Sequence, residues 1–141
     1  MVASVAVWML TASLLVNIMV LIPVCSGLAR DVVRMSVVFG KRSPARDILF
    51  SIYLAILVSS IVLLGLLHVA ATQRCAGCAS AALISVQIIY KSLTPLTVDG
   101  GFPSGRKFNP VVVANVFIAV FHAISLFIFI SSVSDASMTS K

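Results

Sequence analysis

The chain has 141 residues, of which 60% are hydrophobic and 10% charged, and its formal net charge is +6. A soluble domain carries about 25% charged residues, and a small one leaves much of its surface in water. The composition therefore excludes a soluble globular domain and indicates a single polytopic membrane domain over residues 1–141. The charge does not indicate nucleic-acid binding, because half of the ten basic residues lie between two apolar segments, from Arg30 to Arg46.

Four apolar segments are each close to the ~20 residues that a membrane-spanning helix needs. They predict an all-α membrane protein, a four transmembrane helix bundle with short loops. The expected spans cover about residues 5–24, 44–69, 76–94 and 110–131. The first is longer than the ~7–15 apolar residues of a secretory signal and follows no basic residue, so we expect it to be retained.

Helix boundaries are indicated by capping residues and prolines. Ser43 is a good N-cap, Pro44 suits the first helical position and Asp47 faces the positive end of the helix dipole. Pro23 predicts a break near the end of the first span, and Pro95 predicts the end of the third. The polar residues after 131 predict a frayed tail.

Loop charges predict the orientation in the membrane. The first loop holds five basic residues, the third holds Arg106 and Lys107, and the second holds only Arg74. Because cytoplasmic loops collect Lys and Arg, we expect both termini outside and loops one and three in the cytoplasm. The protein is then expected in a plasma membrane, such as a bacterial inner membrane.

The first loop has a feature of its own. Arg30 and Arg34 lie four residues apart among apolar residues up to Phe39. This segment predicts either a short amphipathic helix in the membrane interface or an extension of the first span. The third loop, rich in Gly, Pro and Ser, is expected to be irregular.

Polar residues inside the spans are expected to face other helices, because an unpaired polar group in lipid costs free energy. Helical spacing permits an intramembrane polar network of Asn17, Gln87, Lys91, Asn115 and His122. One interpretation is hydrogen bonding between helices, and the other is a polar relay or small-solute path. Lys91 has a third option, since its stem can carry the ammonium to the interface. The second span, nearly all apolar, is expected to be the most lipid-exposed.

Cys75 and Cys78 form a C-x-x-C motif at the outer start of the third span, near His68. Three interpretations are open: a reactive dithiol activated by Arg74 and the helix start, a metal site, or a local disulfide or two inert thiols. The motif and the four helices resemble the membrane thiol oxidoreductases of the disulfide-bond oxidase and vitamin K epoxide reductase groups. The second outer cysteine pair of those groups is missing, since Cys25 lies at the cytoplasmic end of the first span.

No constellation in the sequence points to catalysis, and we expect no catalytic residue, no metal and no cofactor. The expected role is a non-catalytic accessory or assembly subunit of a membrane complex. The expected surroundings are the lipid bilayer and a membrane protein partner or further copies of the chain, without nucleic acid. The alternatives are a thiol-disulfide oxidoreductase using Cys75 and Cys78, and a small transporter lined by Gln87, Asn115 and His122.

Overall fold

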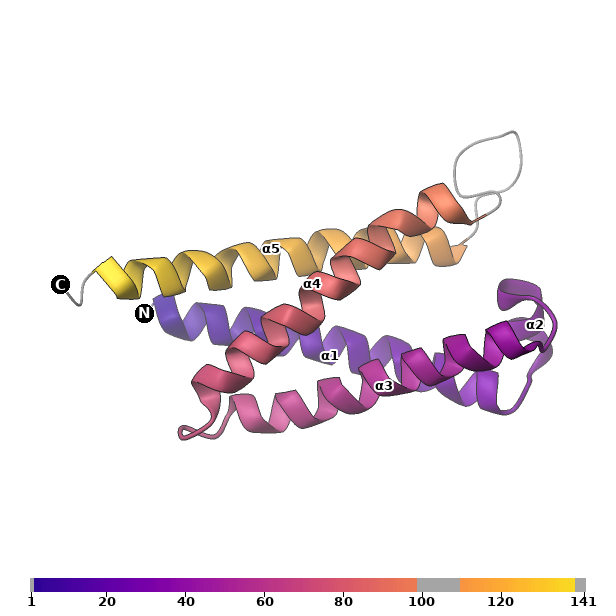
Figure 1. The fold of residues 1–141 in the computed structure, drawn as a ribbon, viewed down its shortest axis with the longest axis horizontal. Helices are drawn as coiled ribbons and strands as arrows, with labels where there is room; N and C mark the ends of the chain where they lie inside the picture. Colours follow the sequence, from indigo (N-terminus) through magenta and orange to yellow (C-terminus); the bar gives the residue numbers. More distant parts are fainter. Residues whose placement is uncertain (1, 99–109, 139–141) are drawn as a thin grey trace.

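A computed structural model describes residues 2–98 and 110–138, with side chains for 5–98 and 110–135. Its described part is a bundle of α-helices without a strand (Figure 1). The helices are α1 (Val2–Ala29), α2 (Val33–Phe39), α3 (Pro44–Leu67), α4 (Gln73–Thr97) and α5 (Pro110–Met138). The predicted all-α bundle is confirmed. The third loop, with the basic residues Arg106 and Lys107, lies outside the described residues.

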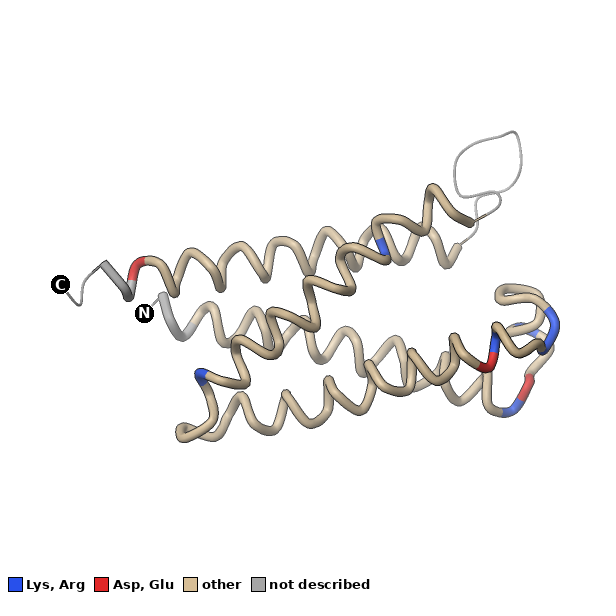
Figure 2. The backbone as a smooth tube through the Cα atoms, viewed as in Figure 1, with Lys and Arg blue, Asp and Glu red and all other residues tan. Residues whose placement is uncertain are grey.

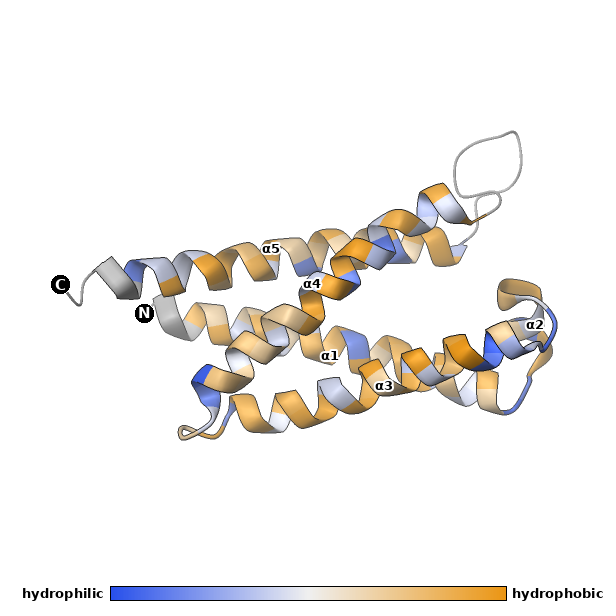
Figure 3. Cartoon of the chain, in the orientation of Figure 1, coloured by the Kyte–Doolittle hydropathy of each residue, from blue (hydrophilic) through white to orange (hydrophobic). Residues whose placement is uncertain are grey.

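Four of these helices are long and apolar enough to cross a membrane, which indicates an integral membrane protein. The candidate spans are Val5–Ala29, Pro44–Leu67, Gln73–Thr97 and Pro110–Asp135. Apolar residues follow all four helices along most of their length (Figure 3). In an apolar 18-residue segment of each helix, the share of residues buried inside the bundle ranges from 11% in α3 to 39% in α1. As predicted, α3 is the helix most exposed to lipid or to a partner.

The long helices alternate in direction, and α1 packs between α3 and α5. α4 packs mainly on α5, while it meets α3 near the tight turn at residues 68–72 (Figure 1). From this turn α3 and α4 diverge toward the end of the bundle where α2 lies. Lys and Arg gather at that end, and the start of α1 and the end of α5 lie at the opposite one (Figure 2).

Two prolines do not end their helices, which corrects the predicted spans. α1 continues past Pro23 to Ala29, and α4 contains Pro95 and ends at Thr97. A proline inside a helix leaves the carbonyl four residues earlier without its N–H donor. In α4 this is the carbonyl of Lys91, and the Thr94 hydroxyl donates to it at 2.7 Å. A side chain therefore replaces the missing backbone donor, as is common in membrane helices.

The other helix ends also differ from the prediction. α3 ends at Leu67 rather than at residue 69, because the Thr72 hydroxyl donates to the Leu66 carbonyl at 2.8 Å and closes the turn. α5 continues to Met138, past the predicted end at 131. Ser132 is accommodated there by its hydroxyl, which donates to the Phe129 carbonyl at 2.7 Å. The prediction of a frayed tail from residue 132 is wrong for residues 132–138, which belong to α5.

The first loop folds as the separate helix α2, which supports the amphipathic helix over an extension of α1. The chain turns at Asp31, whose φ is 50°, and leaves α2 at Gly40, whose φ is 82°. Ser43 caps α3 as predicted, and its hydroxyl accepts from the Arg46 N–H at 3.3 Å. The buried Arg46 guanidinium forms an ion pair with Asp31 and donates to the Gly40 carbonyl at 2.8 Å. One side chain of α3 thus holds both ends of the α2 segment.

Candidate functional site

Four buried polar residues, Ser13, Asn17, Ser60 and His122, form the His122 cluster between α1, α3 and α5. His122 Nδ1 lies 3.2 Å from Ser13 Oγ, and its Nε2 lies 3.1 Å from Asn17 Oδ1. Asn17 Nδ2 donates to Ser60 Oγ at 3.3 Å. Because the Asn17 amide nitrogen is used in this way, its oxygen accepts from His122 Nε2–H. In the neutral imidazole with this tautomer, Nδ1 accepts from the Ser13 hydroxyl.

The His122 cluster is enclosed by protein. His122, Ser13 and Ser60 have no exposed surface, and Asn17 is 3% exposed. Both ring nitrogens of His122 and both polar atoms of the Asn17 amide have partners. Such an arrangement stabilises the contact of three helices and offers no free proton acceptor to a substrate.

Lys91 and Asn115 form a second polar pair, between α4 and α5. Lys91 Nζ donates to Asn115 Oδ1 at 3.2 Å and lies 4.9 Å from the centroid of the Tyr90 ring. Lys91 is 4% exposed, so its side chain is enclosed almost completely by neighbouring helices. In the described part of the chain, Lys91 forms no ion pair with a carboxylate. A buried cation without an anionic partner is unusual in a membrane helix and marks this pair for function.

Four of the five residues predicted as one network therefore lie in two separate hydrogen-bonded groups. Asn17 and His122 meet in one, and Lys91 and Asn115 meet in the other. Gln87 joins neither, because both polar atoms of its buried amide have no hydrogen-bond partner in the described part of the chain. Helical spacing placed these residues on inner faces but did not fix which helix each of them meets.

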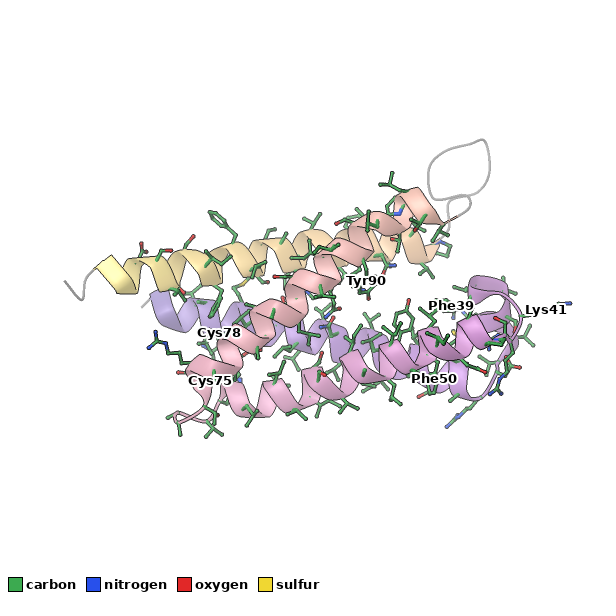
Figure 4. All side chains as sticks on the ribbon, viewed as in Figure 1. Phe39, Lys41, Phe50, Cys75, Cys78 and Tyr90 are labelled. Carbon is green, nitrogen blue, oxygen red and sulfur yellow. The ribbon has the colours of Figure 1, made fainter. Side chains whose placement is uncertain are left out.

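Two adjoining cavities of about 470 and 430 Å³ lie where α3 and α4 diverge. We call them together the α2 cleft, because α2 forms one wall. The residues that line both cavities are Val38, Phe39, Tyr53, Tyr90, Val111 and Asn115. The second cavity also reaches Lys91 and Arg34. Phe39 and Tyr90 face the space between α3 and α4 (Figure 4). Sequence reasoning missed this cleft, and its signal was the apolar face of the 33–39 segment.

Cys75 and Cys78 are exposed free thiols near the start of α4 (Figure 4). Because α4 begins at Gln73, both lie inside the helix and Cys75 does not precede it. His68 is engaged elsewhere, with Thr11 Oγ1 3.2 Å from its Nε2 and the Trp8 ring centroid 6.0 Å from its own. Among the described residues, no group of three His, Cys, Asp or Glu side chains could hold a metal ion. His68 therefore does not come together with Cys75 and Cys78 as a ligand group in the described structure.

Fold and site together define a helical membrane bundle with two internal polar groups and a cleft at its cationic end. Compared with known protein families, curated proteins and solved structures, the chain matches none of them.

Proposed function

We propose that this protein is a non-catalytic subunit of a membrane complex, with α3 as the helix that contacts its partner. The observation that carries the proposal is the outer face of α3. Small residues Ser51, Ala55 and Gly65 lie there at helical spacing with Val58 and Val62. Apart from its chain neighbours and the backbone of its own helix, no atom of the described residues lies within 4 Å of a Cβ at Gly65. Membrane helices associate through faces of this kind, because small residues let backbones approach closely.

The interior supports the same proposal. The one histidine at depth, His122, is enclosed and hydrogen-bonded at both nitrogens, so it ties helices together rather than relaying protons. The same enclosure weighs against a transport path along Gln87, Asn115 and His122. Interhelical hydrogen bonds in membranes contribute about 0.6 kcal/mol each, which suits a packing role.

The test is site-specific photo-crosslinking in the native membrane. A photoreactive amino acid replaces Val58 on α3 or, as a matched control, Val120 on α5, which are 52% and 55% exposed. The expected result is one protein adduct of defined mass from position 58, lost in the Gly65→Leu background and absent from position 120. Co-expression of two differently tagged copies identifies an adduct between copies of the chain. Lipid adducts alone from both positions would overturn the proposal.

A second candidate, thiol-disulfide oxidoreductase, is favoured by one observation. Cys75 and Cys78 are free, exposed and one helical turn apart, beside Arg74 and close to the helix start. A cation and a helix N-terminus both stabilise a thiolate. In the Cys78→Ser variant, Cys75 should then accumulate mixed disulfides, because the resolving thiol is gone. Absence of such adducts from native membranes excludes this candidate.

A further inference from the structure

The α2 cleft is apolar along its walls and reaches the membrane-facing surface. Ile52 of α3 and Val86 of α4 line its first cavity and are 51% and 62% exposed. Phe39, Tyr53 and Tyr90 supply aromatic surface further in. A molecule dissolved in the bilayer can therefore reach the cleft from the side, between α3 and α4. Each cavity lies in the ~300–1,000 Å³ range of small-molecule sites.

The cleft also contains polar groups that lack partners. Tyr90 lines both cavities, and its buried hydroxyl has no hydrogen-bond partner among the described residues. Lys91 lines the second cavity. The Lys91 ammonium has three N–H donors, and among the described residues only one of them is used, in the hydrogen bond to Asn115 Oδ1. Arg34 of α2 lines the same cavity. No Asp or Glu is among the described residues that line either cavity.

We propose that the α2 cleft binds a long-chain carboxylate, a fatty acid taken from the bilayer. Its carboxylate accepts hydrogen bonds from Lys91 and the Tyr90 hydroxyl, with Arg34 adding positive charge. Its hydrocarbon chain lies along the apolar walls and leaves between Ile52 and Val86. The proposal is independent of the partner face on α3.

The chemistry of the cleft selects this class of ligand. Two cations and a phenol hydroxyl, with no acidic residue beside them, favour an anionic head over a zwitterionic or cationic one. Two adjoining cavities of about 470 and 430 Å³ have room for a single hydrocarbon chain with its carboxylate head. A neutral long-chain alcohol would pack along the apolar walls but would leave the Lys91 ammonium without an anionic partner.

The test measures fatty-acid binding to the full chain in nanodiscs of phosphatidylcholine. The probe is palmitate with a photoreactive diazirine in its chain, and competitors are palmitate, hexadecanol and phosphatidylglycerol. Labelling should saturate and map to the helices that line the cleft, including α3 and α4 where the hydrocarbon chain leaves it. Palmitate should compete at least tenfold better than hexadecanol, since one charge-assisted hydrogen bond accounts for about a factor of ten. Phosphatidylglycerol should compete at least tenfold more weakly than palmitate.

Variants locate the carboxylate. Lys91→Met removes the charge at similar length and should raise the half-saturating concentration at least tenfold, and Tyr90→Phe should raise it severalfold. Lys41→Met is the matched control, because Lys41 is exposed outside the cleft and its loss should change nothing (Figure 4). Unsaturable labelling, equal competition by hexadecanol, or an unchanged Lys91→Met variant overturns the proposal. Equal competition by phosphatidylglycerol overturns it in favour of an anionic phospholipid. If Lys91→Met fails to fold, the comparison of competitors on the unmodified chain decides.

Discussion

His122 Nε2 lies 3.1 Å from Asn17 Oδ1, and this contact joins the middle of α5 to the middle of α1. The same Asn17 amide donates to Ser60 Oγ of α3. One side chain therefore connects both neighbours of α1 inside the hydrocarbon region. Because each of these groups is buried, loss of Asn17 removes the partner of His122 Nε2 and the partner of Ser60 Oγ at once.

The first prediction follows from the difference between Asn17 and Gln87. Asn17→Leu should lower the free energy of unfolding by about 1–2 kcal/mol, since two buried groups lose their partner. Gln87→Leu is the matched control, because the Gln87 amide is buried with no partner to lose. This substitution should be neutral or stabilising, since it removes an unsatisfied polar group. Unfolding in mixed micelles of mild detergent and dodecyl sulfate measures both.

Equal destabilisation by the two substitutions would contradict the assignment. It would mean either that the amide of Gln87 has a hydrogen-bond partner or that burial, rather than hydrogen bonding, sets the cost of both substitutions. Asn17→Asp can be measured alongside, because it keeps the acceptor for His122 Nε2–H and removes the donor to Ser60.

The second prediction concerns Arg46, which is 4% exposed and holds both ends of the α2 segment. Arg46→Ala should lower the free energy of unfolding by about 1–3 kcal/mol and release α2, as breaking a largely buried charged contact does. Arg46→Lys should keep only part of the stability that Arg46→Ala loses, because one ammonium cannot reach Asp31, Ser36 and Gly40 together. Hydrogen exchange over residues 33–39 measures the release.

Arg42 provides the control for Arg46. Its ion pair with Asp47 has side chains 61% and 55% exposed, so Arg42→Ala should change stability by less than about 0.5 kcal/mol. Loss of α2 protection in Arg42→Ala as well would show that net charge, not the Arg46 contacts, orders this segment.

The fold could be predicted from the sequence, because four apolar segments of spanning length leave few alternative folds. Ser43 and Pro44 also predicted the start of α3. The sequence did not predict that α1 and α4 continue past Pro23 and Pro95. A proline removes one backbone N–H donor, and whether the helix continues depends on a replacement donor such as the Thr94 hydroxyl. Helical spacing put His122 and Lys91 on inner faces but could not assign their partners, which depend on how the helices rotate. The α2 cleft arises from the divergence of α3 and α4, and no residue pattern encodes that angle.

The third prediction concerns Gly77, where α4 and α5 approach closely. A Cβ at this position would lie 3.2 Å from Phe129 Cε2. Gly77→Val should therefore destabilise the bundle by about 1–3 kcal/mol through overpacking. Gly65→Ala is the opposite case in a helix with open space around it, and it should stabilise by about 0.5–1 kcal/mol. Thermal unfolding of the purified chain separates the two, and a tolerated Gly77→Val would show that α5 can move away.

The fourth prediction tests orientation and burial through the three thiols. Cys75 and Cys78 are exposed at the end of the bundle opposite α2, whereas Cys25 is buried. If both termini face outward, a membrane-impermeant maleimide should label Cys75 and Cys78 in intact cells without reduction, and should label Cys25 only after denaturation. Single-cysteine variants assign each adduct by mass. Arg74→Glu should leave the labelling of the three thiols unchanged, because the five basic residues from Arg30 to Arg46 dominate the charge difference between the two sides of the membrane. Labelling of Cys75 and Cys78 only after the membrane is opened would reverse the orientation and place the thiols in a reducing compartment, where the oxidoreductase candidate loses its oxidising side.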